Sequence, residues 1–310
     1  MKKLLRLFLE LFVLIVLWML GIGIVGAIPV IVITVATSIP VNVTMDMVNY
    51  PWIALGGNIF QCLGTLLAVY LFFVIFGGKL KDIGFSIKGK LGHFGWGLLY
   101  GTGTILCGFL ILLLFGSISI TQERVSMLSM LACLLTFFFV AVSEEVLCRG
   151  AMMTISLKYT NKMVAILVPS LIFGALHFLN KGYSWLSFGN LFLAGIFMGV
   201  YYLYYRNLWF SIAIHFAWNF VQGPLLGFAV SGATTPKWLS HTLNGSSLWT
   251  GGVFGFEGSM LCLILLCVAS AAVYYHFRKA PEPIPLPAST TPESIPHPPA
   301  EIQDCGSTMD

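Results

Sequence analysis

Long apolar segments separated by short polar connections run along most of the chain. A helix of about 20 apolar residues is long enough to cross the ~30 Å hydrocarbon core of a bilayer. The connections are rich in Gly, Asn, Pro and Lys, which interrupt helices. This pattern predicts an all-α, polytopic transmembrane helical bundle of about eight spans, at residues 8–35, 52–76, 94–118, 127–158, 163–180, 184–204, 208–230 and 256–277.

Composition agrees with this pattern. Of the 310 residues, 58% are hydrophobic and 9% are charged, and the mean hydropathy is +0.91. Soluble domains carry about 25% charged residues, so a soluble globular protein is excluded. The net charge is only +4 and its cations are spread over many loops, so no nucleic-acid partner is expected.

The distribution of Lys and Arg predicts the orientation in the membrane. If the N-terminus is cytosolic, twelve of these residues fall on the cytosolic side, and three fall on the other side: Arg124, Lys181 and Lys237. Cytosolic loops are generally enriched in Lys and Arg. We therefore expect an integral, multi-pass protein with both termini in the cytosol, in a bacterial plasma membrane.

Three charged residues interrupt the fourth predicted span, in the stretch AVSEEVLCRGAM. A charge at a helix centre costs a few kcal/mol, so each needs a partner or a function. Glu145 and Arg149 are four residues apart, which predicts an ion pair on one helix face. Glu144 is rotated by about 100° from Glu145 and is left without that partner. A cluster at a helix end facing water is the alternative, but the apolar stretch GAMMTISL follows.

Two later spans also carry polar residues. His177 ends the stretch LIFGALHF, and His215 and Asn219 share one face of SIAIHFAWNF. Glu144 and His177 both lie ~21 Å along their helices from the loop that joins them, so the two can meet. We expect all four side chains to line one cavity that opens toward the cytosol. Hydrogen bonds that only hold the bundle together are the alternative.

Such a cavity has the parts for hydrolysing an amide. A carboxylate beside a histidine can deprotonate a water, while a second histidine and an asparagine can donate hydrogen bonds to an oxyanion. One Glu and two His are also zinc ligand types. However, no HExxH sequence occurs, so no cofactor is favoured and a divalent zinc stays possible.

These residues also form three ordered motifs. The motifs resemble those of the CAAX-processing and bacteriocin-processing (CPBP) family of intramembrane endopeptidases, which includes the type II CAAX prenyl endopeptidases. The resemblance covers about residues 141–230 and rests on Glu144-Glu145-x-x-x-Arg149, Phe173-x-x-x-His177 and His215-x-x-x-Asn219.

The resemblance implies roles for the site residues. Glu144 would be the general base that activates water, and His177 would help to position that water. His215 and Asn219 would form the oxyanion site. Two residues would organise the first motif: Glu145 and Arg149. The family's chemistry is described both as a metalloprotease and as a metal-independent glutamate mechanism, and we favour the latter.

The expected function is therefore an intramembrane endopeptidase that acts on membrane-associated proteins or peptides, among them prenylated CaaX-type proteins. Its partners would be the lipid bilayer and a lipidated or membrane-embedded substrate, with the oligomeric state left open. A non-catalytic immunity or scaffold protein of the same fold is the main alternative. A proton-linked transporter ranks last, because no repeat symmetry is evident.

Three regions follow from these assignments. Residues 1–92 would hold the N-terminal spans and a basic cytosolic loop, and residues 93–279 the protease core. Residues 280–310 are proline-rich with few apolar residues, which predicts a disordered cytosolic tail.

Overall fold

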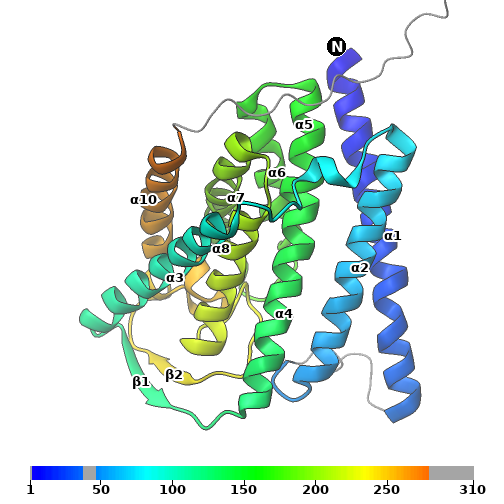
Figure 1. Ribbon diagram of the computed structural model, residues 1–310. Coiled ribbons are helices and arrows are strands. Elements are labelled where there is room, and N and C mark those ends of the chain that lie inside the picture. Colours follow the sequence, from blue (N-terminus) through cyan, green and yellow to red (C-terminus); the bar gives the residue numbers. More distant parts are fainter. Residues whose placement is uncertain (1, 38–46, 279–310) are drawn as a thin grey trace, which may run out of the picture.

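A computed structural model describes residues 2–37 and 47–278, so the predicted tail lies outside the described residues. The fold is an all-α bundle, as predicted (Figure 1). Its long helices are α1 Lys2–Thr37, α2 Pro51–Phe76, α3 Leu91–Leu114, α4 Met127–Glu145, α6 Lys162–Leu176, α7 Trp185–Tyr205, α8 Trp209–Phe220 and α10 Met260–Phe277. Short helical elements are η2 Leu80–Ile83, η3 Val146–Met153, α5 Thr154–Tyr159, η4 Val221–Leu225, α9 Ser247–Thr250, η5 Gly252–Phe254 and η6 Phe256–Gly258.

Six of the described helical segments are long and apolar enough to cross a membrane, and two of the eight expected spans are shorter than predicted. The span expected at 163–180 is α6, which ends at Leu176 after 15 residues. The span expected at 208–230 is α8, which ends at Phe220 after 12 residues and continues as the five-residue η4. Pro224 within η4 lacks the N–H that a continuing helix needs. Hydropathy extended both spans because the residues beyond these helices are apolar.

The fourth expected span is one continuous helical segment, Met127–Tyr159. Its middle part, η3, is a π-helix of eight residues, all of them buried. π-helical turns are rare and occur mostly at functional sites. Here the π-helix follows directly after Glu144 and Glu145 and contains Arg149.

A two-stranded antiparallel sheet was not expected from the sequence. Strand β1 (Ile118–Gln122) pairs with β2 (Leu239–Leu243) at the end of the bundle where α4 begins (Figure 1). The third expected span included Ile118, but α3 ends at Leu114 and the chain turns at Gly116 with a φ of +66°. Because the two strands are far apart in the sequence, the local sequence pattern of one does not predict its pairing with the other.

Small residues allow several helices to approach closely. A Cβ on Gly101 of α3 would lie 2.6 Å from the backbone oxygen of Ile214 in α8. A Cβ on Gly195 of α7 would lie 2.6 Å from Ser170 of α6. Small residues at helix interfaces are a main source of packing in membrane bundles. These contacts hold α3 against α8 and α6 against α7.

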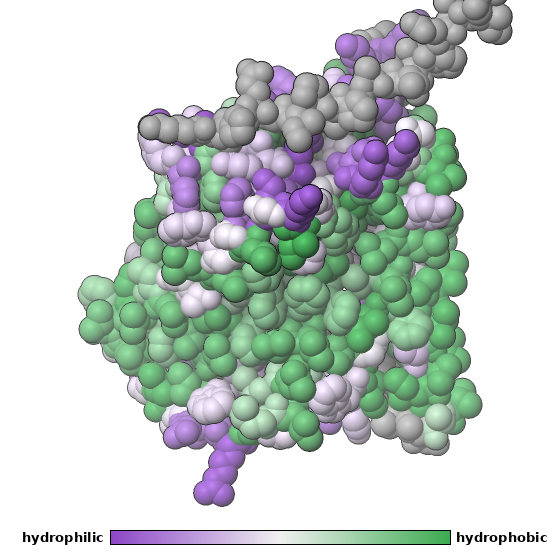
Figure 2. Space-filling view, viewed as in Figure 1, coloured by the Kyte–Doolittle hydropathy of each residue, from purple (hydrophilic) through white to green (hydrophobic). Residues whose placement is uncertain are grey.

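The two ends of the bundle differ in charge. We call the end with the start of α1, η2 and the α5–α6 connection the basic end, and the end with β1 and β2 the hairpin end. Hydrophilic surface gathers at the basic end, above a wide apolar band (Figure 2). The described cations of the basic end are Lys2, Lys3, Arg6, Lys79, Lys81, Lys88, Lys90, Lys158, Lys162, Arg206 and Arg278.

The close contact of α3 with α8 predicts a difference between two neighbouring glycines. Gly101→Ala places a methyl group against the α8 backbone and should destabilise the protein by about 1–3 kcal/mol. Gly103→Ala is the matched control, because a Cβ there meets nothing within 4 Å. Thermal unfolding in detergent should show a lower Tm for Gly101→Ala only. Equal Tm values for both variants would contradict this packing.

Candidate active site

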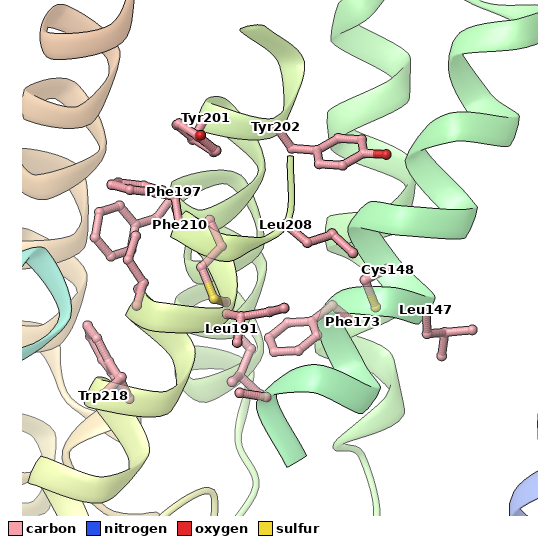
Figure 3. Close-up of a cluster of buried hydrophobic side chains, with 14 of the residues drawn as sticks. Leu147, Cys148, Phe173, Leu191, Phe197, Tyr201, Tyr202, Leu208, Phe210 and Trp218 are labelled. Atoms are coloured by element: carbon pink, nitrogen blue, oxygen red, sulfur yellow. The ribbon is translucent and has the colours of Figure 1, made fainter. Parts of the chain in front are cut away.

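A cavity of about 220 Å³ lies among α4, α6, α7 and α8. Its wall includes all four polar residues expected to converge, namely Glu144, His177, His215 and Asn219. Apolar side chains complete it, among them Phe173, Leu191 and Trp218 (Figure 3). The structure thus brings polar residues of α4, α8 and the C-terminal cap of α6 to the wall of one cavity in an apolar bundle.

A buried charge cluster anchors one wall of the cavity. Nη1 of Arg149 donates to Oε1 of Glu145 at 2.6 Å, which confirms the ion pair expected from their spacing. The same Oε1 lies 2.9 Å from Nδ1 of His215, and Nη2 of Arg149 donates to the backbone oxygen of Gly195 at 3.2 Å. The exposed fractions of the Arg149 and Glu145 side chains are 2% and 0%. These contacts join α4, η3, α7 and α8.

Phe173 packs in the middle of this arrangement. The guanidinium carbon of Arg149 lies 4.9 Å from the centre of its ring. The rings of His177 and His215 meet the same ring at centroid distances of 5.0 and 6.0 Å, with edge-to-face geometry. Arginine and edge-on aromatic groups are both attracted to an aromatic face. One residue therefore contacts members of all three motifs.

Glu144 points to the cavity with an unsatisfied oxygen. Its side chain is 32% exposed, yet Oε2 is buried and has no hydrogen-bond partner. Nε2 of His215 lies 3.8 Å from this oxygen, too far for a direct hydrogen bond. A buried carboxylate oxygen without a partner is costly, so it needs a water or another donor.

His177 lies at the C-terminal cap of α6, one residue past the helix. Its Nδ1 is 2.8 Å from the backbone oxygen of Phe173. A carbonyl oxygen only accepts, so Nδ1 must carry the proton of a neutral ring and Nε2 is left as an acceptor. The early end of α6 therefore gives the cavity an imidazole with an available lone pair.

His215 and Asn219 share one face of α8, as expected, and both are buried at the cavity wall. Because Nδ1 of His215 is held by Glu145, its Nε2 is the nitrogen that faces Glu144. The π-helical η4 begins two residues after Asn219. The bond from His215 to Glu145 was not foreseen, since the sequence suggested only that Glu145 pairs with Arg149.

The cavity extends toward the hairpin end, opposite the loops that the sequence analysis placed in the cytosol. Residues from three connections at the hairpin end line it: Met47, Asn180, Ser231 and Ala233. The wall includes no residue of the described connections at the basic end. Helices α6 and α8 both start at the basic end and stop early, which leaves space at the opposite end.

Sequence reasoning missed one acidic residue of the wall. Glu257 of η6 is buried and lines the cavity. Its Oε1 accepts from Nε1 of Trp218 at 3.1 Å, and its Oε2 accepts from the backbone N and Oγ of Ser231 at 2.6 and 2.8 Å. An acid in the apolar stretch GGVFGFEGSM was the available signal. Glu257 ties the connection after α8 to the cavity wall.

The described residues contain no group of three or more His, Cys, Asp or Glu side chains placed to hold a metal ion. The zinc set considered from the sequence, one Glu with two His, is therefore not among such groups.

Comparison with known families agrees with the motifs. Residues 126–221 match the family model described as type II CAAX prenyl endopeptidase Rce1-like. The matched part runs from the N-cap of α4 into the start of η4 and contains all three motifs, so the resemblance is confirmed for this segment. The match supports intramembrane protease activity of the CAAX type. Comparisons with curated proteins and with solved structures gave no match.

The buried cluster predicts strong coupling between Glu145 and Arg149. Arg149→Met leaves the Glu145 charge in an apolar interior and should cost about 3–5 kcal/mol of stability. The double variant Glu145→Gln/Arg149→Met should cost clearly less than the sum of the two single variants. Thermal unfolding in detergent measures both.

Lys237→Met is the matched control, because Lys237 pairs with Glu123 at 3.7 Å on the surface. It should cost less than about 1 kcal/mol. Additive effects of Glu145→Gln and Arg149→Met would show that the two charges do not stabilise each other.

Proposed function

We propose that this protein is an intramembrane endopeptidase in which Glu144 activates a water to cleave a peptide bond of a membrane-associated polypeptide. One observation carries the proposal: a buried, unpartnered carboxylate oxygen at the wall of a cavity that two histidines and an asparagine also line. Charged side chains within a membrane generally have a function, because burying a charge in apolar surroundings costs free energy.

The first step is activation of the water. Oε2 of Glu144 accepts one hydrogen bond from a water, and the free Nε2 of His177 accepts a second. Two acceptors fix the orientation of the water and leave an oxygen lone pair directed at the substrate carbonyl. A positioned general base contributes typically 10²–10⁴-fold to the rate.

The second step is attack on the carbonyl carbon. Glu144 takes a proton as the water oxygen bonds to that carbon, and negative charge develops on the carbonyl oxygen. Asn219 donates from its amide nitrogen to this oxyanion, and His215 donates from Nε2 when it is protonated. Glu145 supports the protonated ring, because its Oε1 lies 2.9 Å from Nδ1 of His215. Donors fixed in advance cost no reorganisation during the reaction.

The third step is breakdown of the tetrahedral intermediate. The proton held by Glu144 passes to the leaving nitrogen as the C–N bond breaks. The products are a carboxylic acid and an amine, and Glu144 returns to its ionised form. One carboxyl group thus acts first as base and then as acid, so the cycle needs no further proton donor.

The size of the cavity limits the form of the substrate. At about 220 Å³, the space is smaller than typical ligand pockets of about 300–1,000 Å³. An α-helix with its side chains is about 10–12 Å wide and does not fit. The scissile segment must therefore enter as a short extended stretch, from an unwound or non-helical part of the substrate.

A purely structural role explains the site less well. At the same cavity, both carboxylate oxygens of Glu257 are bound, by Trp218 and Ser231. Oε2 of Glu144 lines the cavity without a hydrogen-bond partner. Oε2 of Glu145 also lacks one, but Glu145 is fully buried and is not part of the cavity wall. Glu144 is therefore the acid of the wall with an available oxygen, which favours catalysis over a binding or scaffold role.

If Glu144 is the general base, replacing it with glutamine should slow peptide cleavage. Glu144→Gln keeps the size of the side chain but cannot take the proton, so peptide cleavage should fall by about 10²–10⁴-fold. Purified protein in nanodiscs would be incubated with membrane-anchored peptides, and products identified by mass spectrometry. Glu123→Gln is the control, since Glu123 is an exposed acid outside the cavity. Undiminished cleavage by Glu144→Gln would contradict the proposal.

The oxyanion site predicts a different kinetic signature. Asn219→Ala removes a donor that is needed mainly in the transition state, so kcat should fall about 10²–10³-fold with little change in KM. Steady-state kinetics on the same peptide would separate the two constants. A rise in KM at constant kcat would assign Asn219 to substrate binding instead.

A further inference from the structure

We propose that the cavity opens on the extracytoplasmic side of the membrane, and that its substrate is a membrane-anchored polypeptide whose scissile segment is exposed at that outer face. The identity of the substrate rests on the proposed protease function, whereas the orientation of the cavity does not. Three separate features of the described residues point to this arrangement.

The first feature is charge. All eleven described cations of the basic end lie opposite the hairpin end, which has only Arg124, Lys181 and Lys237. An excess of Lys and Arg in short loops marks the cytosolic side. The two sets of cations lie on elements at opposite ends of the bundle (Figure 1), and hydrophilic surface gathers at the basic end (Figure 2). The charge bias is therefore present in the folded molecule as well as in the sequence. The hairpin end is therefore the outer end.

The second feature is the length of α6 and α8. Helix α6 has 15 residues, or ~22 Å, and α8 with the adjoining η4 has 12 and five residues, or at most ~25 Å. Both lengths are less than the ~30 Å of the hydrocarbon core. Both helices begin at the basic end. The missing length is therefore on the hairpin side, where His177 and Asn219 meet the cavity.

The third feature is a seal between the cavity and the basic end. Tyr202, fully buried, bonds through its hydroxyl to Oγ1 of Thr154 at 2.9 Å and to the backbone oxygen of Ile83 at 3.3 Å. Leu208 is also fully buried. In Figure 3, Tyr202 and Leu208 lie above Phe173, on the side away from Trp218. This packed layer separates the cavity from the basic end, whereas residues of the hairpin end form part of the cavity wall.

The residues around the hairpin end of the cavity suit a substrate that is held at the membrane interface. The α6–α7 connection, which includes His177 and Asn180, presents Phe178 and Leu179 with exposed fractions of 62% and 93%, and Trp185, the first residue of α7, is 82% exposed. Tryptophan is enriched at membrane–water interfaces, at the level of the lipid headgroups. A polypeptide anchored in the outer leaflet would therefore reach the cavity without leaving the interface.

This orientation separates two classes of substrate. A polypeptide exported across the membrane and retained by an anchor presents its backbone at the open end of the cavity. A prenylated tail on the cytosolic face meets the basic end, where Tyr202 and Leu208 block the path to Glu144. The first class fits the proposed orientation and the second does not.

Labelling in intact cells tests the orientation without any assay of activity. Arg124→Cys places a thiol at the hairpin end and Lys81→Cys places one at the basic end, and both positions are exposed. A membrane-impermeant maleimide should label Arg124→Cys above the wild-type background and should label Lys81→Cys only after permeabilisation. The wild type carries seven cysteines and sets that background. The reverse pattern would overturn the proposal.

A pair of reporters then tests the substrate class. The same peptide segment is anchored beside the membrane on the outer face or on the cytosolic face, and cleavage is compared between wild type and Glu144→Gln. Glu144-dependent cleavage of the outer reporter alone is expected. Cleavage of the cytosolic reporter alone would overturn the substrate class. If labelling shows an outer mouth but neither reporter is cut, the orientation holds and the protease function fails.

Discussion

The ion pair of Glu145 with Arg149, and its link to His215, is the interaction on which the site depends. Two charges buried in an apolar bundle are tolerated only when further hydrogen bonds satisfy them. Gly195 supplies a backbone oxygen, His215 a ring nitrogen, and Phe173 an aromatic face. These partners come from α6, α7 and α8, so satisfying one ion pair fixes the positions of four helices. Glu144 is held at the cavity as a consequence.

The adjacent carboxylates of Glu144 and Glu145 have different roles in this site. Glu145 binds Arg149 and His215 through Oε1 and holds the site together, while Glu144 lines the cavity. The Oε2 atom of each is buried without a hydrogen-bond partner, but only that of Glu144 lies at the cavity wall. The π-helical η3 starts at the next residue and has all its residues buried. This π-helical turn, which is wider than an α-helical turn, directly follows Glu144 and Glu145, whose carboxylates must face protein and not lipid.

The sequence predicted the helical bundle, the Glu145–Arg149 pair and the meeting of the three motifs, because each depends on local spacing or composition. It did not predict where α6 and α8 end. Hydropathy measures whether a residue avoids water and does not show where a helix ends. After Leu176 the chain exposes the apolar side chains of Phe178 and Leu179, and after Phe220 it continues as the largely buried η4. The pairing of β1 with β2 and the hydrogen bonds of Glu257 join residues that are far apart in the sequence. The spacing of residues within one segment therefore cannot predict them.

The most direct test of the central claim is an experimental structure of Glu144→Gln with an uncleaved peptide bound. The account predicts a scissile carbonyl oxygen within about 3.2 Å of Nε2 of His215 and of the Asn219 amide nitrogen. It also predicts a water between the residue 144 side chain and His177, facing the carbonyl carbon. A peptide whose carbonyl points away from α8, or a carbonyl carbon that no water beside residue 144 can reach, would contradict it.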